Sequence, residues 1–117
     1  MSEENRQHKR VKINRKALII QSTGEKVVAK ACDVSVAGVG IVCEYSCDVG
    51  QTFELMVNLL GNPKAGLLHV KAQARFINLI GGLDAYRIGF QIVEFYGNSE
   101  KILASYIQSR SNQPSWV

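Results

Sequence analysis

Apolar and polar residues alternate along most of this chain. The alternation is clearest over residues 52–59, 68–76 and 87–92. Because successive side chains of a strand point to opposite faces, each stretch predicts a strand with one buried face. Weaker alternation, interrupted by turn-forming residues, predicts three more strands over residues 11–20, 26–34 and 39–45.

The spacing of apolar residues changes near the C-terminus and predicts a helix there. Asn98 is placed to cap its first turn. The apolar stripe of this helix consists of Ile102, Leu103, Tyr106 and Ile107. About six short strands with no helix between them predict an all-β fold, a six-stranded antiparallel β-barrel with the C-terminal helix covering one open end.

One register argument concerns a predicted hairpin between residues 68–78 and 86–96. The even-numbered apolar residues of both strands must face the same core, so the numbers of two opposed residues add to an even value, 162 or 164. At 162, Arg75 and Arg87 lie opposite each other on the outer face, where a bound anion would reduce their repulsion. At 164 they do not, and both arginines simply face water.

Composition limits the class of protein. The chain has 117 residues, 46% of them hydrophobic and 21% charged, which predicts one folded domain. No apolar run approaches the roughly 18 residues that span a bilayer, and the N-terminus is charged, so we expect a cytoplasmic protein without membrane insertion. Cys32, Cys43 and Cys47 form no CxxC pair and lie among apolar residues, which favours free buried thiols over disulfides or metal ligands.

The positive charge is concentrated at the N-terminus. Residues 1–16 hold six basic and two acidic residues, a difference equal to the net charge of +4 for the whole chain. We therefore expect a flexible basic arm over residues 1–12, a folded barrel with its helix over 13–110, and a tail over 111–117.

Two short motifs flank the first predicted hairpin. Arg6 and Arg10 form an RxxxR spacing, and Asp33, Ser35 and Gly38 form a DxSxxG spacing. Each is common alone, because a basic arm readily contains two arginines, and Asp-x-Ser before a glycine of positive φ is a frequent turn. In this order, and followed by an RxGF strand that begins at Arg87, they are specific. Over about residues 5–110 the chain resembles the PilZ family of bacterial cyclic di-GMP receptors, whose fold is such a barrel.

The resemblance implies that the two motifs bind different edges of a cyclic dinucleotide. The guanidinium groups of Arg6 and Arg10 match a guanine O6/N7 edge or a phosphate. The Asp33 carboxylate and the Ser35 hydroxyl match the N1–H and N2–H₂ edge, and Gly38 lets the backbone approach closely.

Other positions have weaker claims on the ligand. Lys9 adds electrostatic attraction, and His8 either stacks on a base or is an exposed spacer. Arg87 matches a basic position in the RxGF strand of the family. The complete candidate ligand-binding set is Arg6, Arg10, Asp33, Ser35, Gly38, Arg87, Lys9, His8 and Arg75. His69 lies on the polar face of its strand and is expected to be solvated.

The expected function is that of a stand-alone receptor. By resemblance, cyclic di-GMP orders residues 4–12 over the barrel and so creates a surface for an unidentified effector protein, with motility, exopolysaccharide synthesis or virulence as outputs. Asn5 replaces the arginine that is common in the family before RxxxR, which leaves open whether one nucleotide or an intercalated pair binds. Monomer and homodimer both remain possible.

Two other functions compete with this one. A small barrel with a basic arm is also typical of single-stranded nucleic-acid binding, but the parity of the pattern turns Phe53, Phe76 and Phe90 inward and leaves no aromatic platform. A PilZ-fold adaptor that binds no nucleotide would usually lack one of the motifs. We expect no nucleic acid, no metal and no enzyme activity, because the chain has no HExxH, no P-loop and no nucleophile placed beside a base.

Overall fold

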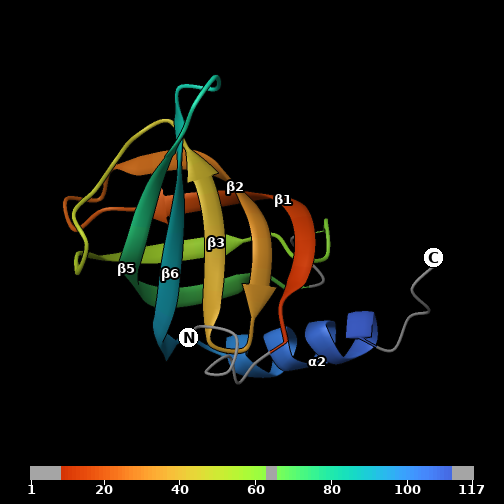
Figure 1. Cartoon of the computed structure of the whole chain (residues 1–117). Coiled ribbons are helices and arrows are strands. Elements are labelled where there is room, and N and C mark those ends of the chain that lie inside the picture. The colour runs from red at the N-terminus through yellow and green to blue at the C-terminus, as the bar shows by residue number, and fades with distance from the viewer. Residues whose placement is uncertain (1–8, 63–65, 112–117) are drawn as a thin grey trace.

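The computed structural model describes residues 9–62 and 66–111, and these form a closed barrel with a helix at one end (Figure 1). The strand order around the barrel is β1-β2-β3-β6-β5-β4, and every neighbouring pair is antiparallel. The elements are β1 (Val11–Ile20), β2 (Lys26–Ser35), β3 (Gly38–Cys43), β4 (Thr52–Val57), β5 (Leu68–Ile80), β6 (Ala85–Phe95) and α2 (Ser99–Ser111). The predicted six-stranded barrel with a C-terminal helix is confirmed.

Helix α2 covers one end of the barrel (Figure 1). Leu103, Tyr106 and Ile107 are buried and belong to the same apolar cluster as the inward-facing residues of the strands. The predicted stripe is therefore the face that packs on the barrel, because residues three and four apart lie on one side of a helix.

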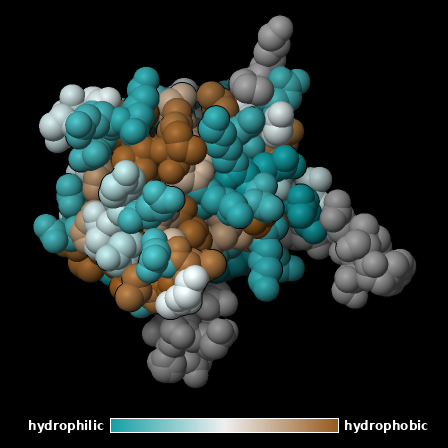
Figure 2. All heavy atoms as spheres, turned by 90° about the horizontal axis from the view of Figure 1, so that it is seen from above, coloured by the Kyte–Doolittle hydropathy of each residue, from teal (hydrophilic) through white to brown (hydrophobic). Residues whose placement is uncertain are grey.

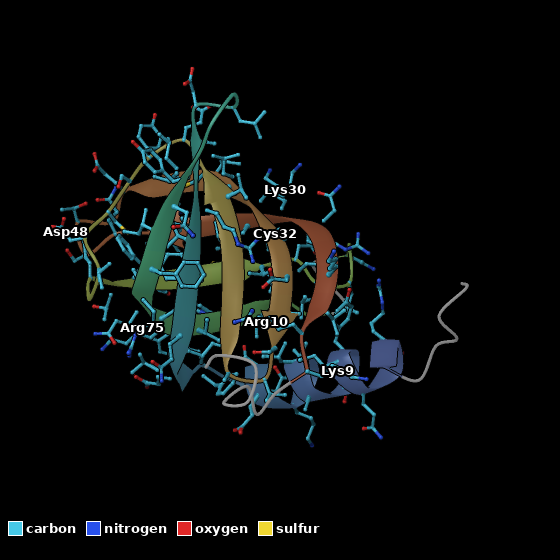
Figure 3. All side chains as sticks on the ribbon, viewed as in Figure 1. Lys9, Arg10, Lys30, Cys32, Asp48 and Arg75 are labelled. Carbon is cyan, nitrogen blue, oxygen red and sulfur yellow. The ribbon has the colours of Figure 1, made fainter. Side chains whose placement is uncertain are left out.

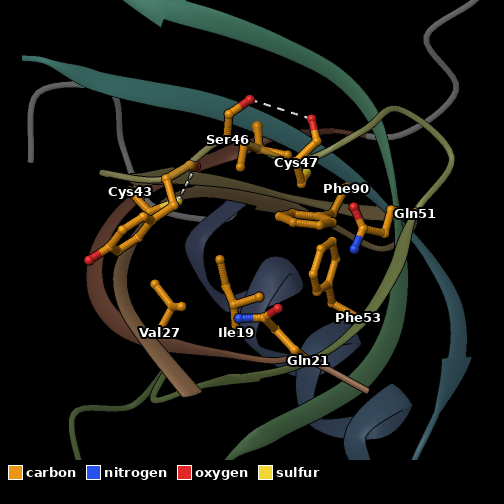
Figure 4. Close-up of a pocket in the computed structure, with 11 residues that line it drawn as sticks. Ile19, Gln21, Val27, Cys43, Ser46, Cys47, Gln51, Phe53 and Phe90 are labelled. Atoms are coloured by element: carbon orange, nitrogen blue, oxygen red, sulfur yellow. Dashed lines mark hydrogen bonds between the residues drawn. The ribbon is translucent and has the colours of Figure 1, made fainter. Parts of the chain in front are cut away.

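The opposite end of the barrel is more open. Figure 4 looks into this end, with α2 beyond it. A small cavity of about 90 Å³ lies here. Phe53 and Phe90 line the cavity with their rings edge to face at 5.9 Å, and Cys43 and Cys47 lie at its border. All three cysteines are free, as predicted, but only Cys43 is fully buried.

Two β-bulges change which side of the barrel the following residues face. In β2 the register shifts between Ala31 and Asp33, so that Val34 takes the inward position and Asp33 turns outward. In β5 the register shifts between Ala74 and Phe76 in the same way. The prediction that Phe76 faces the core is wrong, because this bulge turns its ring to the outer face, where the residue is 43% exposed.

Two register shifts set the pairing of the β5–β6 hairpin, one between Lys71 and Ala72 and one between Ala74 and Phe76. Paired residue numbers add to the predicted even value, 164, only between Ala72 and Ala74; on either side they add to 165, so the prediction is wrong for the rest of the hairpin. Arg87 is opposite Asn78, so the alternative in which Arg75 faces Arg87 directly is excluded. The tip of this hairpin projects beyond the barrel (Figure 1).

Figure 2 shows the molecule from above, on the side away from α2, where hydrophobic residues lie among hydrophilic ones. Exposed hydrophobic residues of the hairpin include Leu79 and Leu83, which are 66% and 68% exposed. Within the described residues, no helix has the length and apolar character needed to cross a membrane.

Candidate functional site

Asp33 is held between two arginines from different parts of the chain. Arg10, just before β1, donates from Nη1 to Asp33 Oδ1 at 2.7 Å. Arg87 of β6 donates from Nη2 to Asp33 Oδ2 at 2.5 Å, and from Nη1 to the Cys32 sulfur at 2.9 Å. We call Arg10, Cys32, Asp33 and Arg87 the Asp33 cluster. Figure 3 shows Arg10 and Cys32 on the same side of the barrel.

The Asp33 cluster carries an excess of positive charge that is open to solvent. The side chains of Arg10 and Arg87 are 39% and 37% exposed, whereas that of Asp33 is only 10% exposed. A guanidinium group has five N–H donors, so each arginine keeps donors that Asp33 does not use. The cluster can therefore accept an anion at its arginines and an N–H donor at its carboxylate.

Electrostatics within the cluster fix the charge states. The hydrogen bond to Asp33 raises the pKa of Arg87 further above its ordinary value, against an opposing effect of burial. Burial raises the pKa of the Cys32 thiol, and the negative charge of Asp33 raises it further. The positive charge of Arg87 lowers this pKa, but by less. At neutral pH Arg87 is therefore a cation and Cys32 is a neutral thiol.

Two glycines of β3 make room for this arrangement. A Cβ on Gly40 would lie 2.7 Å from Asp33 Oδ1, so only glycine lets the carboxylate rest against β3. A Cβ on Gly38 would lie 2.7 Å from the carbonyl oxygen of Phe90. The prediction of a positive φ at Gly38 is wrong, since Gly38 is not among the described glycines with positive φ. Glycine is needed at this position for another reason, which is the close packing of β3 on β6.

Ser35 holds the turn between β2 and β3. Its hydroxyl oxygen accepts hydrogen bonds from the backbone N–H groups of Ala37 at 3.2 Å and Gly38 at 3.1 Å, and the residue is buried. This turn places the start of β3 beside Asp33. The DxSxxG motif thus combines one carboxylate on the outer face with two residues that shape the backbone around it.

The other predicted site residues are distributed as follows. Arg75 lies on the outer face but apart from the cluster, and its Nη1 donates to Gln91 Oε1 at 2.7 Å. Lys9 is exposed next to Arg10. Arg6 and His8 lie outside the described residues. The structure therefore unites Arg10, Asp33 and Arg87 from the predicted set.

Sequence reasoning missed several residues of this surface. Cys32 and Gly40 contact Asp33 directly, and Gly89 lies beneath Phe76. For the two glycines the available signal was their position inside predicted strands, Gly40 in 39–45 and Gly89 in 87–92, because a glycine within a strand often marks the close approach of another group. His69 is also more than a solvated histidine, because its Nε2 pairs with the Glu54 carboxylate and its ring lies 4.6 Å from that of Tyr96.

The family model described as the PilZ domain matches residues 4–109. This chain belongs to the PilZ domain family. In the part of this PilZ domain that the structure describes, no three His, Cys, Asp or Glu side chains come together as a metal site. A comparison with curated proteins finds no match.

Solved structures share the fold of this PilZ domain. The inhibitor of motility MotI from Bacillus subtilis has a TM-score of 0.76 and 17% identity, and the match covers 92% of this chain and 52% of MotI. The PilZ domain of YcgR from Escherichia coli, solved with c-di-GMP, has a TM-score of 0.67 and 20% identity over 91% of both chains. The K. pneumonia MrkH–c-di-GMP complex has a TM-score of 0.69 and 14% identity, over 89% of this chain and 51% of MrkH. The chain thus spans about half the length of MotI and MrkH.

Proposed function

We propose that this PilZ domain is a receptor for cyclic di-GMP. The observation that carries the proposal is the Asp33 cluster, which brings a carboxylate and two half-exposed arginines together on one face. Membership of the PilZ family supports it, as do the c-di-GMP complexes of YcgR and MrkH among the structures of the same fold.

The chemistry of the cluster suits a ligand with two guanines and two phosphates. Arg10 and Arg87 offer N–H donors for phosphate oxygens or a guanine O6/N7 edge. Asp33 already accepts one arginine hydrogen bond at each oxygen, and Oδ2 also has a long contact of 3.8 Å to the Cys32 thiol, a weak donor that a ligand can replace; a carboxylate has about four acceptor sites. It therefore retains capacity for the N1–H and N2–H₂ groups of a guanine.

The residues before β1 complete the proposed site. Arg10 is already paired with Asp33, and Val11 and Lys12 belong to β1. We assign the ordering step to the residues before Arg10, with Arg6 and His8 closing over the nucleotide while Lys9 adds attraction. Ordering costs roughly 1–2 kcal/mol of backbone entropy per residue, so part of the binding energy is converted into a new surface for an effector protein.

Calorimetry of cyclic di-GMP binding tests the proposal. Arg10→Ala and Asp33→Ala are each expected to weaken binding by at least about tenfold, because each leaves a charged or polar ligand edge without its partner. Arg110→Ala is the matched control: it also removes a guanidinium group, but one on α2 that contacts Tyr106. GTP and GMP should compete poorly. No binding to the native chain, or equal affinities for all four proteins, would contradict the proposal.

The exposure of Phe76 gives single-stranded nucleic-acid binding some support, because an outward aromatic ring can stack on a base. Such proteins combine several aromatic rings with a basic groove, whereas Phe76 is a single aromatic ring on its strand. A filter-binding measurement separates the two functions: the receptor should retain cyclic di-GMP and ignore oligonucleotides at physiological salt.

A further inference from the structure

The open end of the barrel holds a cavity that is separate from the Asp33 cluster, since no residue that lines it belongs to that cluster. Its aliphatic walls include Ile19 and Val27, and the rings of Phe53 and Phe90 meet there edge to face (Figure 4). An engineered apolar cavity of roughly 150 Å³ binds benzene. The cavity here is smaller, about 90 Å³, so it fits a branched aliphatic group such as a leucine side chain better than an aromatic ring.

The cavity adjoins a wider groove on the outside of the same end. The groove has a volume of about 730 Å³, and it shares four lining residues with the cavity, which are Gln21, Val27, Tyr45 and Ser46. Val28 and Tyr45 present apolar surface along the groove and are 65% and 63% exposed. An aliphatic group that enters the cavity can therefore belong to a longer molecule that lies in the groove.

The rim of this end is acidic, unlike the chain as a whole. Glu25 and Glu44 line the groove and are exposed. Burial raises the pKa of the Cys47 thiol at the mouth of the cavity, and the nearby charge of Asp48 raises it further. Among the described residues that line the groove, Lys26 is the only basic one. The rim is therefore negative on a chain whose net charge is +4.

The cavity, the groove and the rim together select one kind of occupant. An aliphatic side chain gains free energy by leaving water for an apolar cavity. The carboxylates of the rim attract cations and repel anions, which disfavours nucleic acids and anionic lipids. A pocket for an apolar side chain inside a polar rim is the usual arrangement at the centre of a protein–protein interface. A peptide segment in which an aliphatic residue is flanked by Lys or Arg satisfies all three conditions.

We propose that the open end of the barrel docks a basic segment of a partner protein, which inserts one leucine-sized side chain into the cavity and sets flanking Lys or Arg side chains against the rim. The inference goes beyond the proposed receptor function, because no residue that lines the cavity or the groove belongs to the Asp33 cluster. It gives the domain a second face for partners, separate from the one that the residues before Arg10 would form.

Defined peptides titrated into the ¹⁵N-labelled chain test the docking surface by NMR. The probe is acetyl-Lys-Lys-Leu-Lys-Lys-amide, and its comparison peptides have Ala in place of Leu or Glu in place of each Lys. The leucine peptide should shift the amides of Cys43, Ser46 and Cys47, which lie at the cavity. The alanine peptide should bind about tenfold more weakly, because it does not fill the cavity. The glutamate peptide should also bind more weakly, because the rim repels it.

Variants of the chain identify the groups that the peptide contacts. The double substitution Glu25→Gln and Glu44→Gln should weaken binding of the leucine peptide by about threefold, as the loss of two exposed ion pairs would. Glu100→Gln, at an exposed acid of α2 beyond the other end of the barrel, is the matched control and should have no effect. Val27→Phe should abolish binding by filling the cavity. The two glutamine substitutions are at exposed positions, so they decide the test if the larger side chain disturbs the fold.

The outcomes separate the docking surface from its alternatives. A leucine peptide that does not bind, or an alanine peptide that binds equally well, would overturn the proposal. Equally tight binding of free isoamylamine, which joins the same branched chain to a cation, would also overturn it and indicate a small-molecule site. Shifts confined to Gly40 and Gly89 would place the peptide at the Asp33 cluster and contradict the docking surface. None of these results bears on the receptor function, which is measured by cyclic di-GMP binding.

Discussion

The Phe76 ring on the outer face of the barrel leaves room only for glycine at position 89. A methyl group there would overlap the Phe76 ring, so Gly89→Ala should lower the free energy of unfolding by about 1–3 kcal/mol, as overpacking does elsewhere. Denaturant unfolding measures the effect. In a Phe76→Ala background the same substitution should cost much less. An equal cost in both backgrounds would show that the ring is not the obstacle.

The three thiols give the molecule a pH dependence at the alkaline end. Burial raises the pKa of Cys32, Cys43 and Cys47 above the value each has in the unfolded chain. Above about pH 8.5 the unfolded state loses these protons first, so stability should fall as pH rises from there toward the folded pKa values. Unfolding curves at pH 7.5 and 9.5 should show the fall, and it should be smaller when all three are replaced by alanine. An unchanged fall would assign it to other groups.

Contacts between elements fix where helix α2 begins. Ser99 is buried in the first turn of α2, and its hydroxyl oxygen accepts a hydrogen bond from the backbone N–H of His69 in β5 at 2.8 Å. Ser99→Ala leaves that N–H without this partner and should destabilise the fold by about 1–2 kcal/mol in denaturant unfolding. Ser105→Ala, at an exposed position of the same helix, is the control and should have little effect. Equal stability of both variants would contradict the role given to Ser99.

The strands and the helix were predictable because each depends on a local pattern. Alternation gave the strand positions, and spacings of three and four gave α2. The bulges were not predictable in the same way. In the sequence, Ala74 and Phe76 continue the alternation of apolar and polar residues. Only the pairing of β5 with β6 shows that the register shifts between them. The position of Phe76 was missed for this reason.

The site was predicted in part. The motifs identified Arg10, Asp33 and Arg87, which meet in the structure although they are far apart in sequence. Their pairing was not foreseen, because motif spacing carries no information about which guanidinium group reaches which carboxylate oxygen. The role of Gly40 required knowing that Asp33 lies against β3.

At the scale of the whole molecule, charge should govern how binding responds to salt. The chain carries a net charge of +4, and the ligand carries two phosphates. Cyclic di-GMP affinity should therefore fall as sodium chloride rises from 50 to 500 mM, because salt screens exposed charges. Lys9→Ala, which removes an exposed cation next to Arg10, should make the fall shallower. Affinity independent of salt would contradict an electrostatic contribution from the basic arm.

The most direct test of the site is an NMR titration of the ¹⁵N-labelled chain with cyclic di-GMP. Glycine amides are well separated in such spectra, and three of them report on the proposed surface: Gly38, Gly40 and Gly89. We predict that these amides shift the most among the glycines, while Gly24 and Gly82, which lie in turns away from the Asp33 cluster, keep their positions. Shifts at Gly24 or Gly82 with none at Gly40 and Gly89 would place the ligand elsewhere and contradict the account.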